Sequence, residues 1–378
     1  MAVTTGAQGV PAEVESAEGS SVEVAGQWRL MWLKFKRHRL AYLSLIVLCF
    51  FYFVALFCEF FAPTTTTEFW REYVYAPPQT LGVIHEGRPL LHVDGYGFER
   101  DPRTFEKTWT IDENKAIPVG FFVKGEPYKL WGLIPMDRHF IGPTEAGEPF
   151  FLWGSDKSGR DVFSRNIYSS RISLTIGLVG VAFSLFLGIL IGGLSGLLGG
   201  WVDNVAQRII EVFMSVPQLP IWIALAAMVP LTWSPTRVYF VTSIIVSLLG
   251  WTWMARVVRG KFLSLREEDF VLAAKLDGCS RMRLVFKHML PSFYSHIIAS
   301  LTLAIPAMIV GETALSFLGL GLRAPVVSWG VLLRDTQQIA VLALSPWLML
   351  PAVSVVTVVL AFNFLGDGLR DAADPYAR

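Results

Sequence analysis

Long apolar segments recur along this chain, and they constrain its fold more than any other feature. Each is long enough to cross the ~30 Å hydrocarbon core of a bilayer as a helix. They cover residues 40–61, 172–198, 212–231, 238–258, 293–309 and 347–365. With 53% hydrophobic and only 17% charged residues, the chain is too apolar for an ordinary soluble globule. We therefore expect an all-α membrane protein with six transmembrane helices.

The distribution of basic residues predicts the orientation of these helices. One group precedes the first apolar segment and a second group lies between the fourth and the fifth. They are Arg29, Lys34, Lys36, Arg37 and Arg39, then Arg256, Arg259, Lys261, Arg266, Lys275, Arg281, Arg283 and Lys287. Cytoplasmic flanks carry an excess of Lys and Arg, so both groups and both termini are expected in the cytoplasm. The net charge of +1 gives no indication of a nucleic-acid partner.

Composition divides the chain into four regions. Residues 1–27 lack periodicity and are expected to form a disordered cytoplasmic tail, and residues 28–61 hold a cytoplasmic segment and the first transmembrane helix. Residues 62–150 are richer in acids than in bases and are expected to form a small β-rich extracytoplasmic insertion between helices 1 and 2. Residues 151–378 then form a five-helix core with a cytoplasmic loop at 256–291.

Motifs for enzyme chemistry are incomplete. The sequence G-S-D-K-S-G-R-D at residues 154–161 has the glycine spacing of a phosphate-binding loop, but Arg160 and Asp161 stand where Lys and Ser or Thr are needed. His85-Glu86 lacks the second histidine of a zinc-protease helix. We expect no catalytic site, cofactor or metal in this chain, so that any ATPase is a separate protein.

The three cysteines predict neither a disulfide nor a metal site. Cys49 and Cys58 share one apolar segment, where a helix would hold them ~13 Å apart along its axis. Cys279 has no Cys or His at metal-ligand spacing. All three are interpreted as small packing residues.

Glycines and prolines predict how the apolar helices pack and bend. Small-x-x-x-small spacing in the second segment lets helix backbones approach closely in lipid. The glycines concerned are Gly188, Gly192, Gly193, Gly196, Gly199 and Gly200. Pro217 and Pro220 in the third segment, and Pro306 in the fifth, predict kinks or breaks.

The cytoplasmic segment at residues 266–291, R-E-E-D-F-V-L-A-A-K-L-D-G-C-S-R-M-R-L-V-F-K-H-M-L-P, predicts a short helix, a turn and a second helix. Three acids, Glu267, Glu268 and Asp269, stand where the dipole of a helix N-terminus favours them, and Gly278 permits a sharp change of direction. One side of the first helix carries Phe270, Leu272 and Leu276. That side suits insertion into a groove on a soluble partner, and the alternative is a basic, merely solvated loop.

The same segment resembles the characteristic cytoplasmic loop of ABC-importer permeases, E-A-A, three residues, Gly, nine residues, Ile-x-Leu-Pro. The spacing matches without a gap at Ala273, Ala274, Gly278, Leu290 and Pro291. Leu272 stands at the glutamate position and His288 at the isoleucine position.

Three further blocks narrow this resemblance to the C-type membrane subunit of the dipeptide and oligopeptide (peptide/nickel) importers. They are G-S-D-K-S-G-R-D-V-F-S-R at 154–165, G-E-T-A-L-S-F-L-G-L-G at 311–321 and F-N-F-L-G-D-G-L-R-D-A-A-D-P at 362–375. The resemblance covers residues 28–61 and 150–378, whereas the insertion is longer than in ordinary family members. Its position suggests that it contacts a substrate-binding protein or caps the outer mouth.

The resemblance implies a type I ABC-importer permease fold in the cytoplasmic (inner) membrane. The implied partners are a homologous B-type permease subunit in a heterodimer, two ATP-binding cassette ATPase subunits, an extracytoplasmic substrate-binding protein and the lipid bilayer. The cytoplasmic hairpin would be the coupling helix that meets an ATPase. Its expected coupling residues are Glu267, Glu268, Asp269, Ala273, Ala274, Asp277, Gly278 and Arg281.

Other interpretations stay open at this point. Glu312 and Asn363, near the ends of apolar segments, either line the translocation pathway or bond a neighbouring helix. The cargo is expected to be peptides, and relatives that carry nickel or oligosaccharides such as α-galactosides are the alternative. A stand-alone channel or secondary carrier, or a membrane-anchored adhesion or sensor protein, would use the same spans differently.

Overall fold

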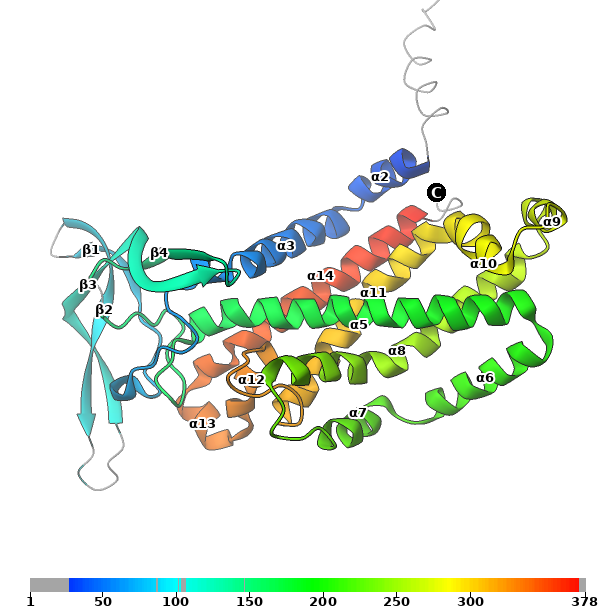
Figure 1. Cartoon of the computed structure of the whole chain (residues 1–378). Helices are drawn as coiled ribbons and strands as arrows, with labels where there is room; N and C mark the ends of the chain where they lie inside the picture. The colour runs from blue at the N-terminus through cyan, green and yellow to red at the C-terminus, as the bar shows by residue number, and fades with distance from the viewer. Residues whose placement is uncertain (1–26, 86–87, 101, 103–106, 146, 374–378) are drawn as a thin grey trace, which may run out of the picture.

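A computed structural model describes residues 27–85, 88–100, 102, 107–145 and 147–373. The tail predicted at residues 1–27 thus lies almost entirely outside the described residues. Long helices run side by side, and a small sheet sits at one end of them (Figure 1). We call this end the sheet end and the opposite end, where α9 (Asp269–Leu276) lies, the α9 end.

Five helical stretches in the described part of the chain are long and apolar enough to cross a membrane. They are α3 (Arg39–Leu56), α5 (Val162–Leu198), α8 (Pro235–Leu265), Arg281–Phe317, which ends in α11 (Tyr294–Phe317), and Pro346–Ala372, which includes most of α14 (Leu350–Ala373). A sixth span is present if α6 (Gly200–Ser215) and α7 (Gln218–Ala227), bent by 85° relative to each other, cross together. The mostly helical architecture with five to six apolar helices is confirmed.

The third apolar segment, expected at residues 212–231, is not one helix: it is divided between the end of α6 and α7. The chain leaves the helical conformation at Val216 and Pro217, because Pro217 lacks the N–H that a continuing helix would use. The predicted break at this proline is confirmed. Pro306, by contrast, lies inside α11 without ending it.

Local capping explains where the longest helix begins and ends. The Asp161 carboxylate accepts hydrogen bonds from the N–H groups of Phe163 (3.1 Å) and Ser164 (2.7 Å), so α5 begins at Val162, well before the apolar segment itself. It ends at Leu198, and the capping residue that follows is Gly199, whose φ of +63° suits glycine. The polar first turns of α5 explain why hydropathy alone places its start too late.

Shorter elements connect the long helices. They are α2 (Gln27–Arg37), α4 (Cys58–Phe61), the 3₁₀ turn Arg71–Tyr73, α10 (Arg281–Arg283), the π-helical turn Leu284–Met289, the 3₁₀ turns Leu290–Phe293, Arg334–Gln337 and Pro346–Met349, α12 (Trp329–Leu333) and α13 (Ile339–Leu344).

The helices pack closely where glycines remove side chains. A Cβ added at Gly192 would lie 2.2 Å from the carbonyl oxygen of Ala255, and one at Gly196 would lie 2.8 Å from the Cβ of Phe262. Both glycines belong to α5 and both neighbours to α8. The close-packing interpretation of these glycines is therefore confirmed.

Residues 81–143, within the predicted insertion at 62–150, contain a four-stranded antiparallel sheet of order β1-β2-β3-β4. The strands are β1 (Leu81–His85), β2 (Arg88–Arg100), β3 (Lys107–Leu130) and β4 (Ile134–Pro143). Val93 on β2, and Ile117 and Val119 on β3, form a small core with Phe150. The Nδ1 of the buried His139 side chain lies 2.5 Å from the carbonyl oxygen of Ala62, which fastens β4 to the end of α4.

Candidate functional site

The short helix α9 is closed at both ends by its own backbone. The carbonyl of Glu268 accepts hydrogen bonds from two N–H groups of the first turn, each at 3.0 Å. At the other end Gly278 has φ +74°, and the N–H of Cys279 donates to the carbonyl of Ala274 at 3.1 Å. Ser280 then caps the following helical segment. The predicted helix, turn and second helix are therefore present.

Two small apolar residues attach α9 to the long helices. Val271 and Ala274 are buried in a cluster that draws on α5, α8 and the segment leading into α11. Their partners there include Ile189, Met254, Val258, Phe262, Leu284, Met289 and Phe293. Because packed cores deform little, a displacement of α9 must carry these helices with it.

The opposite side of α9 is exposed. Phe270 and Leu272 are exposed, and Leu276 is 88% exposed, the most of the three. The other exposed residues predicted for this surface are Glu267, Glu268, Asp269, Ala273, Asp277, Gly278 and Arg281. Ala274 is the exception, because it faces the chain's own helices. The exposed set, with Phe270, Leu272 and Leu276, is called the α9 surface below.

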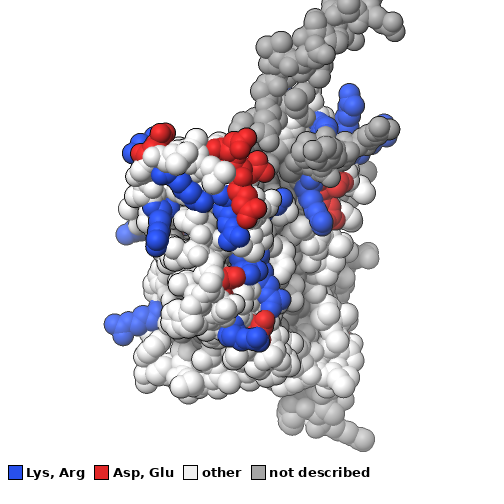
Figure 2. Space-filling view, turned by 90° about the vertical axis from the view of Figure 1, so that its right-hand side faces the viewer, with Lys and Arg blue, Asp and Glu red and all other residues white. Residues whose placement is uncertain are grey.

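Positive charge gathers around the α9 surface. Figure 2 views the α9 end directly and shows Lys and Arg side chains scattered over that face, with fewer acids among them. Exposed basic residues of this segment include Lys261, Lys275, Arg281, Arg283 and Lys287. The long apolar helices thus meet a surface rich in basic residues at this end.

An ion pair at the same end joins α6 to α8. The Nε and one terminal nitrogen of Arg259 each lie 2.5 Å from a carboxylate oxygen of Asp203, and the hydroxyl of Ser195 on α5 also donates to that carboxylate. Sequence reasoning missed this pair, because Arg259 was one of eight basic residues in its region and Asp203 lies 56 positions away.

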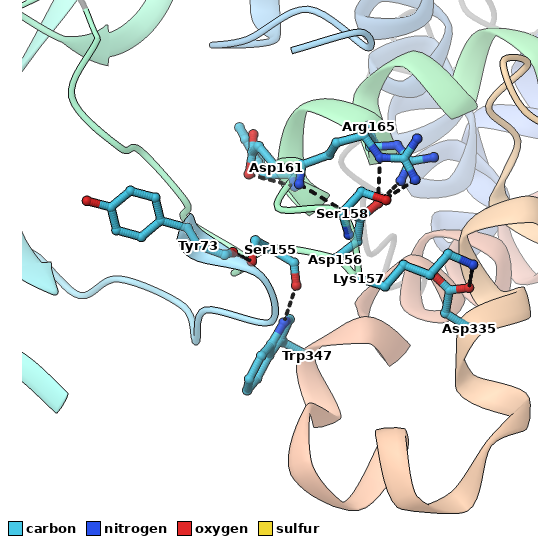
Figure 3. A network of polar contacts seen from close by, with 11 residues as sticks. Tyr73, Ser155, Asp156, Lys157, Ser158, Asp161, Arg165, Asp335 and Trp347 are labelled. Carbon is cyan, nitrogen blue, oxygen red and sulfur yellow. Dashed lines mark hydrogen bonds and ion pairs between the residues drawn. The ribbon is translucent and has the colours of Figure 1, made fainter. Parts of the chain in front are cut away.

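The motif at residues 154–161 forms a hydrogen-bonded hub at the sheet end (Figure 3). The buried Asp156 carboxylate accepts from the N–H groups of Ser158 (2.8 Å) and Arg160 (3.1 Å) and from the guanidinium groups of Arg160 and Arg165. The loop therefore folds around its own carboxylate.

Two contacts extend this hub to distant parts of the chain. Lys157 lies 2.7 Å from a carboxylate oxygen of Asp335, and the indole N–H of Trp347 donates to the carbonyl of Ser155 at 3.0 Å (Figure 3). The Ser155 hydroxyl donates to the carbonyl of Tyr73, at the edge of the insertion. The start of α5, the insertion and the segment before α14 are thus held together.

The two residues predicted near a pathway lie in different surroundings. Glu312 is fully buried and accepts hydrogen bonds from the hydroxyls of Ser316 (2.7 Å), Ser328 (2.7 Å) and Ser173 (3.3 Å). It thereby bonds neighbouring helical segments and faces no open space. Asn363 is half-buried on α14.

A cavity of about 350 Å³ lies where α6 and α7 break, against α8 and α11. Its lining is mainly aromatic and aliphatic and includes Phe213, Met214, Trp222, Leu249, Trp253 and Met308. The Trp222 indole N–H is buried without a hydrogen-bond partner. A cavity with such a lining is suited to apolar groups.

Cys49, Cys58 and Cys279 are free. Within the residues that the structure describes, no three His, Cys, Asp or Glu side chains group closely enough to hold a metal ion.

Comparison with known families decides what kind of chain carries this arrangement. Residues 185–378 match the family described as binding-protein-dependent transport system inner membrane component. The chain belongs to this permease family. Residues 26–78 of the permease also match the N-terminal transmembrane domain of oligopeptide transport permease C.

Curated relatives of the permease carry peptide-transport names. The dipeptide transport system permease protein DppC of Bacillus subtilis is 40% identical over 227 residues, which cover 60% of this chain and 69% of that protein. The oligopeptide transport system permease protein OppC of Haemophilus influenzae is 38% identical over 237 residues, which cover 62% of this chain and 73% of that protein. The resemblance to C-type peptide permeases is confirmed, and the permease is a multi-pass membrane protein.

Solved structures resemble the permease only distantly. The inward-facing MetNI methionine ABC transporter (CY5 native crystal form) aligns with a TM-score of 0.38 and 18% identity. The alignment covers 53% of this chain and 94% of that chain.

Proposed function

We propose that this permease is one of the two membrane subunits of an ATP-driven importer that moves dipeptides or oligopeptides across the cytoplasmic membrane. The names of its relatives support peptides as the cargo class. Its partners would be a B-type permease, two ATPase subunits and an extracytoplasmic substrate-binding protein.

The basic face at the α9 end supports a cytoplasmic position for that end. The C-terminal part of α14, in which Arg370 stands, belongs to the same end, as does α2. Both described ends of the chain would then lie in the cytoplasm, and the sheet would lie outside the cell.

The observation that carries the coupling proposal is the division of α9 into two faces. One face is buried among α5, α8 and the start of α11 through Val271 and Ala274. The other presents Phe270, Leu272 and Leu276, all of which are exposed, Leu276 most of all. A helix that packs against its own chain on one side and exposes apolar side chains on the other is suited to binding in a groove on a separate protein.

Force applied to α9 has a structural route to the cavity. Phe262 and Val258 connect α9 to α8, and Arg259 on α8 is tied to Asp203 on α6. The far end of α6 is the break at Val216, which lines the cavity. ATP-driven closure of the ATPase pair would therefore change the cavity's shape by moving α6 and α8 as a unit.

Substitution of the α9 surface tests this proposal. Leu276→Asp places a charge on a side chain that makes no core contact, so folding is preserved while an apolar groove would reject it. Ile339→Asp is the matched control, because Ile339 is 83% exposed on α13 at the sheet end. We expect Leu276→Asp, and not Ile339→Asp, to lose co-purification with the ATPase and ATP-dependent uptake. Full ATPase association in Leu276→Asp would refute docking at α9.

A further inference from the structure

The turn between β3 and β4 presents an apolar surface that the importer mechanism does not use. Trp131, Leu133 and Ile134 are all exposed there, and Leu133 reaches 78% exposure. Lys129, just before the turn, is exposed as well. Exposing such large apolar side chains on a short turn to water is unfavourable in free energy unless lipid or protein covers them.

Hydrogen bonds fix this turn to the end of the first span. The Trp131 indole N–H donates to the carbonyl of Leu56, the last residue of α3, at 2.7 Å. The Trp131 ring also lies 5.5 Å from the ring of Phe57, measured between centroids. Together with the contact from His139 to Ala62, these contacts hold β4 beside the end of α3 (Figure 1). The height of the turn is therefore set by α3.

The length of α3 sets that height relative to the bilayer. Its 18 residues rise ~27 Å, close to the ~30 Å hydrocarbon thickness. With Arg39 at one membrane boundary, Leu56 and the Trp131 ring lie at the other. Arg171 donates to the Leu56 carbonyl at 2.8 Å and pairs with Glu59 at 2.6 Å. A charged pair at the depth of Leu56 is consistent with a position at the membrane boundary, where charge is tolerated.

The turn also continues the outward surface of α3. Leu43, Ile46, Phe50 and Phe53 form an exposed apolar stripe along that helix. Phe53 contacts Phe57, which contacts Trp131, so the apolar surface passes without a gap from the span onto the sheet. Lipid that covers this stripe of α3 would therefore also reach the turn.

We propose that the turn Trp131–Ile134 is an interfacial anchor that seats in the headgroup region of the bilayer and holds the sheet against the membrane. Trp131 lies at the depth where tryptophan is enriched, and Leu133 and Ile134 enter the acyl boundary. Lys129 extends its ammonium toward lipid phosphates. This inference goes beyond the transport proposal, because it requires only that α3 cross a membrane.

Spin-label accessibility tests the anchor in the full chain. Cys49, Cys58 and Cys279 are first replaced by Ala, and a single Cys is then placed at Leu133. The control is Val83→Cys, 66% exposed on β1 at the opposite edge of the sheet. Each nitroxide-labelled variant is reconstituted in vesicles of phosphatidylcholine and phosphatidylglycerol and exposed to oxygen or a water-soluble nickel chelate.

We expect oxygen to relax the label at position 133 more strongly than the nickel chelate does, and the reverse order at position 83. Equal access of the chelate to both positions would place the turn in water and overturn the anchor. Exclusion of both reagents from position 133 would overturn it too, because protein and not lipid would then cover the turn. Neither outcome depends on peptide uptake.

Discussion

The guanidinium of Arg259 on α8 donates two hydrogen bonds of 2.5 Å each to the carboxylate of Asp203 on α6. A planar fork matched to a carboxylate fixes both the separation and the rotation of the two groups. The pair joins the first turn of α6 to α8, and Ser195 on α5 donates to the same carboxylate, so it stiffens three helices at the α9 end.

Arg259→Lys should weaken this link although it preserves the charge, because an ammonium cannot make the paired contact. We expect a loss of about 1–3 kcal/mol in stability, seen as a lower Tm of the purified chain in detergent. The control is Arg208→Lys, since both partners of the Arg208–Glu211 pair are far more exposed than those of the Arg259–Asp203 pair. An equal Tm change in both variants would contradict a special role for Arg259.

Adjacent glycines on α5 should differ sharply in their tolerance of alanine. Gly192→Ala would bring a Cβ to 2.2 Å from a carbonyl oxygen of α8, whereas Gly193→Ala would meet its nearest atom at 3.5 Å. The first variant should lose about 1–3 kcal/mol, and the second should be neutral or slightly stabilised. Thermal unfolding of the two variants in the same detergent measures the difference. Equal tolerance would mean that α5 and α8 are not in this contact.

Much of the architecture could be predicted because hydropathy, glycine spacing and prolines are local signals. Pro217 predicted a break, but its 85° angle depends on what α6 and α7 pack against. The start of α5 was predicted too late, since its first turns carry Ser164, Arg165 and Asn166 and their polarity hides a helix that Asp161 caps. The pairing of Asp203 with Arg259 had no local signal at all. Similarly, Glu312 was recognised as unusual, but two of its three hydroxyl partners, Ser173 and Ser328, come from other segments of the chain.

Gly278→Val should uncouple ATP hydrolysis from transport while leaving the chain in the membrane. At φ +74° a β-branched side chain is strained, so the turn after α9 would shift and misplace the α9 surface. Gly260→Ala is the control, because a Cβ there meets no neighbour within 4 Å. ATPase activity and peptide uptake are measured together in proteoliposomes. Undiminished uptake by Gly278→Val would count against this hairpin as the coupling element.

Glu68, in the segment before the sheet, should make stability depend on pH. Burial, followed by the negative charge of Glu126, raises the pKa of Glu68 from 4.5 to about 7, and its Oε2 has no hydrogen-bond partner. Between pH 4.5 and about pH 7 the folded state therefore binds more protons than the unfolded state. The contribution of Glu68 to the free energy of unfolding falls as pH rises through this range. Glu68→Gln should raise Tm at pH 8 and converge with the native chain below pH 4.5. The exposed Glu72→Gln serves as the control, and a pH-independent Tm difference at Glu68 would exclude titration as the cause.

Filling the cavity beside the α6–α7 break should alter which peptides the importer moves. Ala307 on α11 lines the cavity, and Ala307→Phe would occupy part of its ~350 Å³. If apolar side chains of the cargo enter there, uptake of triphenylalanine should fall by about tenfold relative to triglycine, a difference of ~1.4 kcal/mol. Val310→Phe is the control, because Val310 is exposed on the same helix and does not line the cavity. An equal loss of uptake for both peptides in Ala307→Phe would indicate a general defect in the conformational cycle. The cavity would then have no part in determining which peptides are transported.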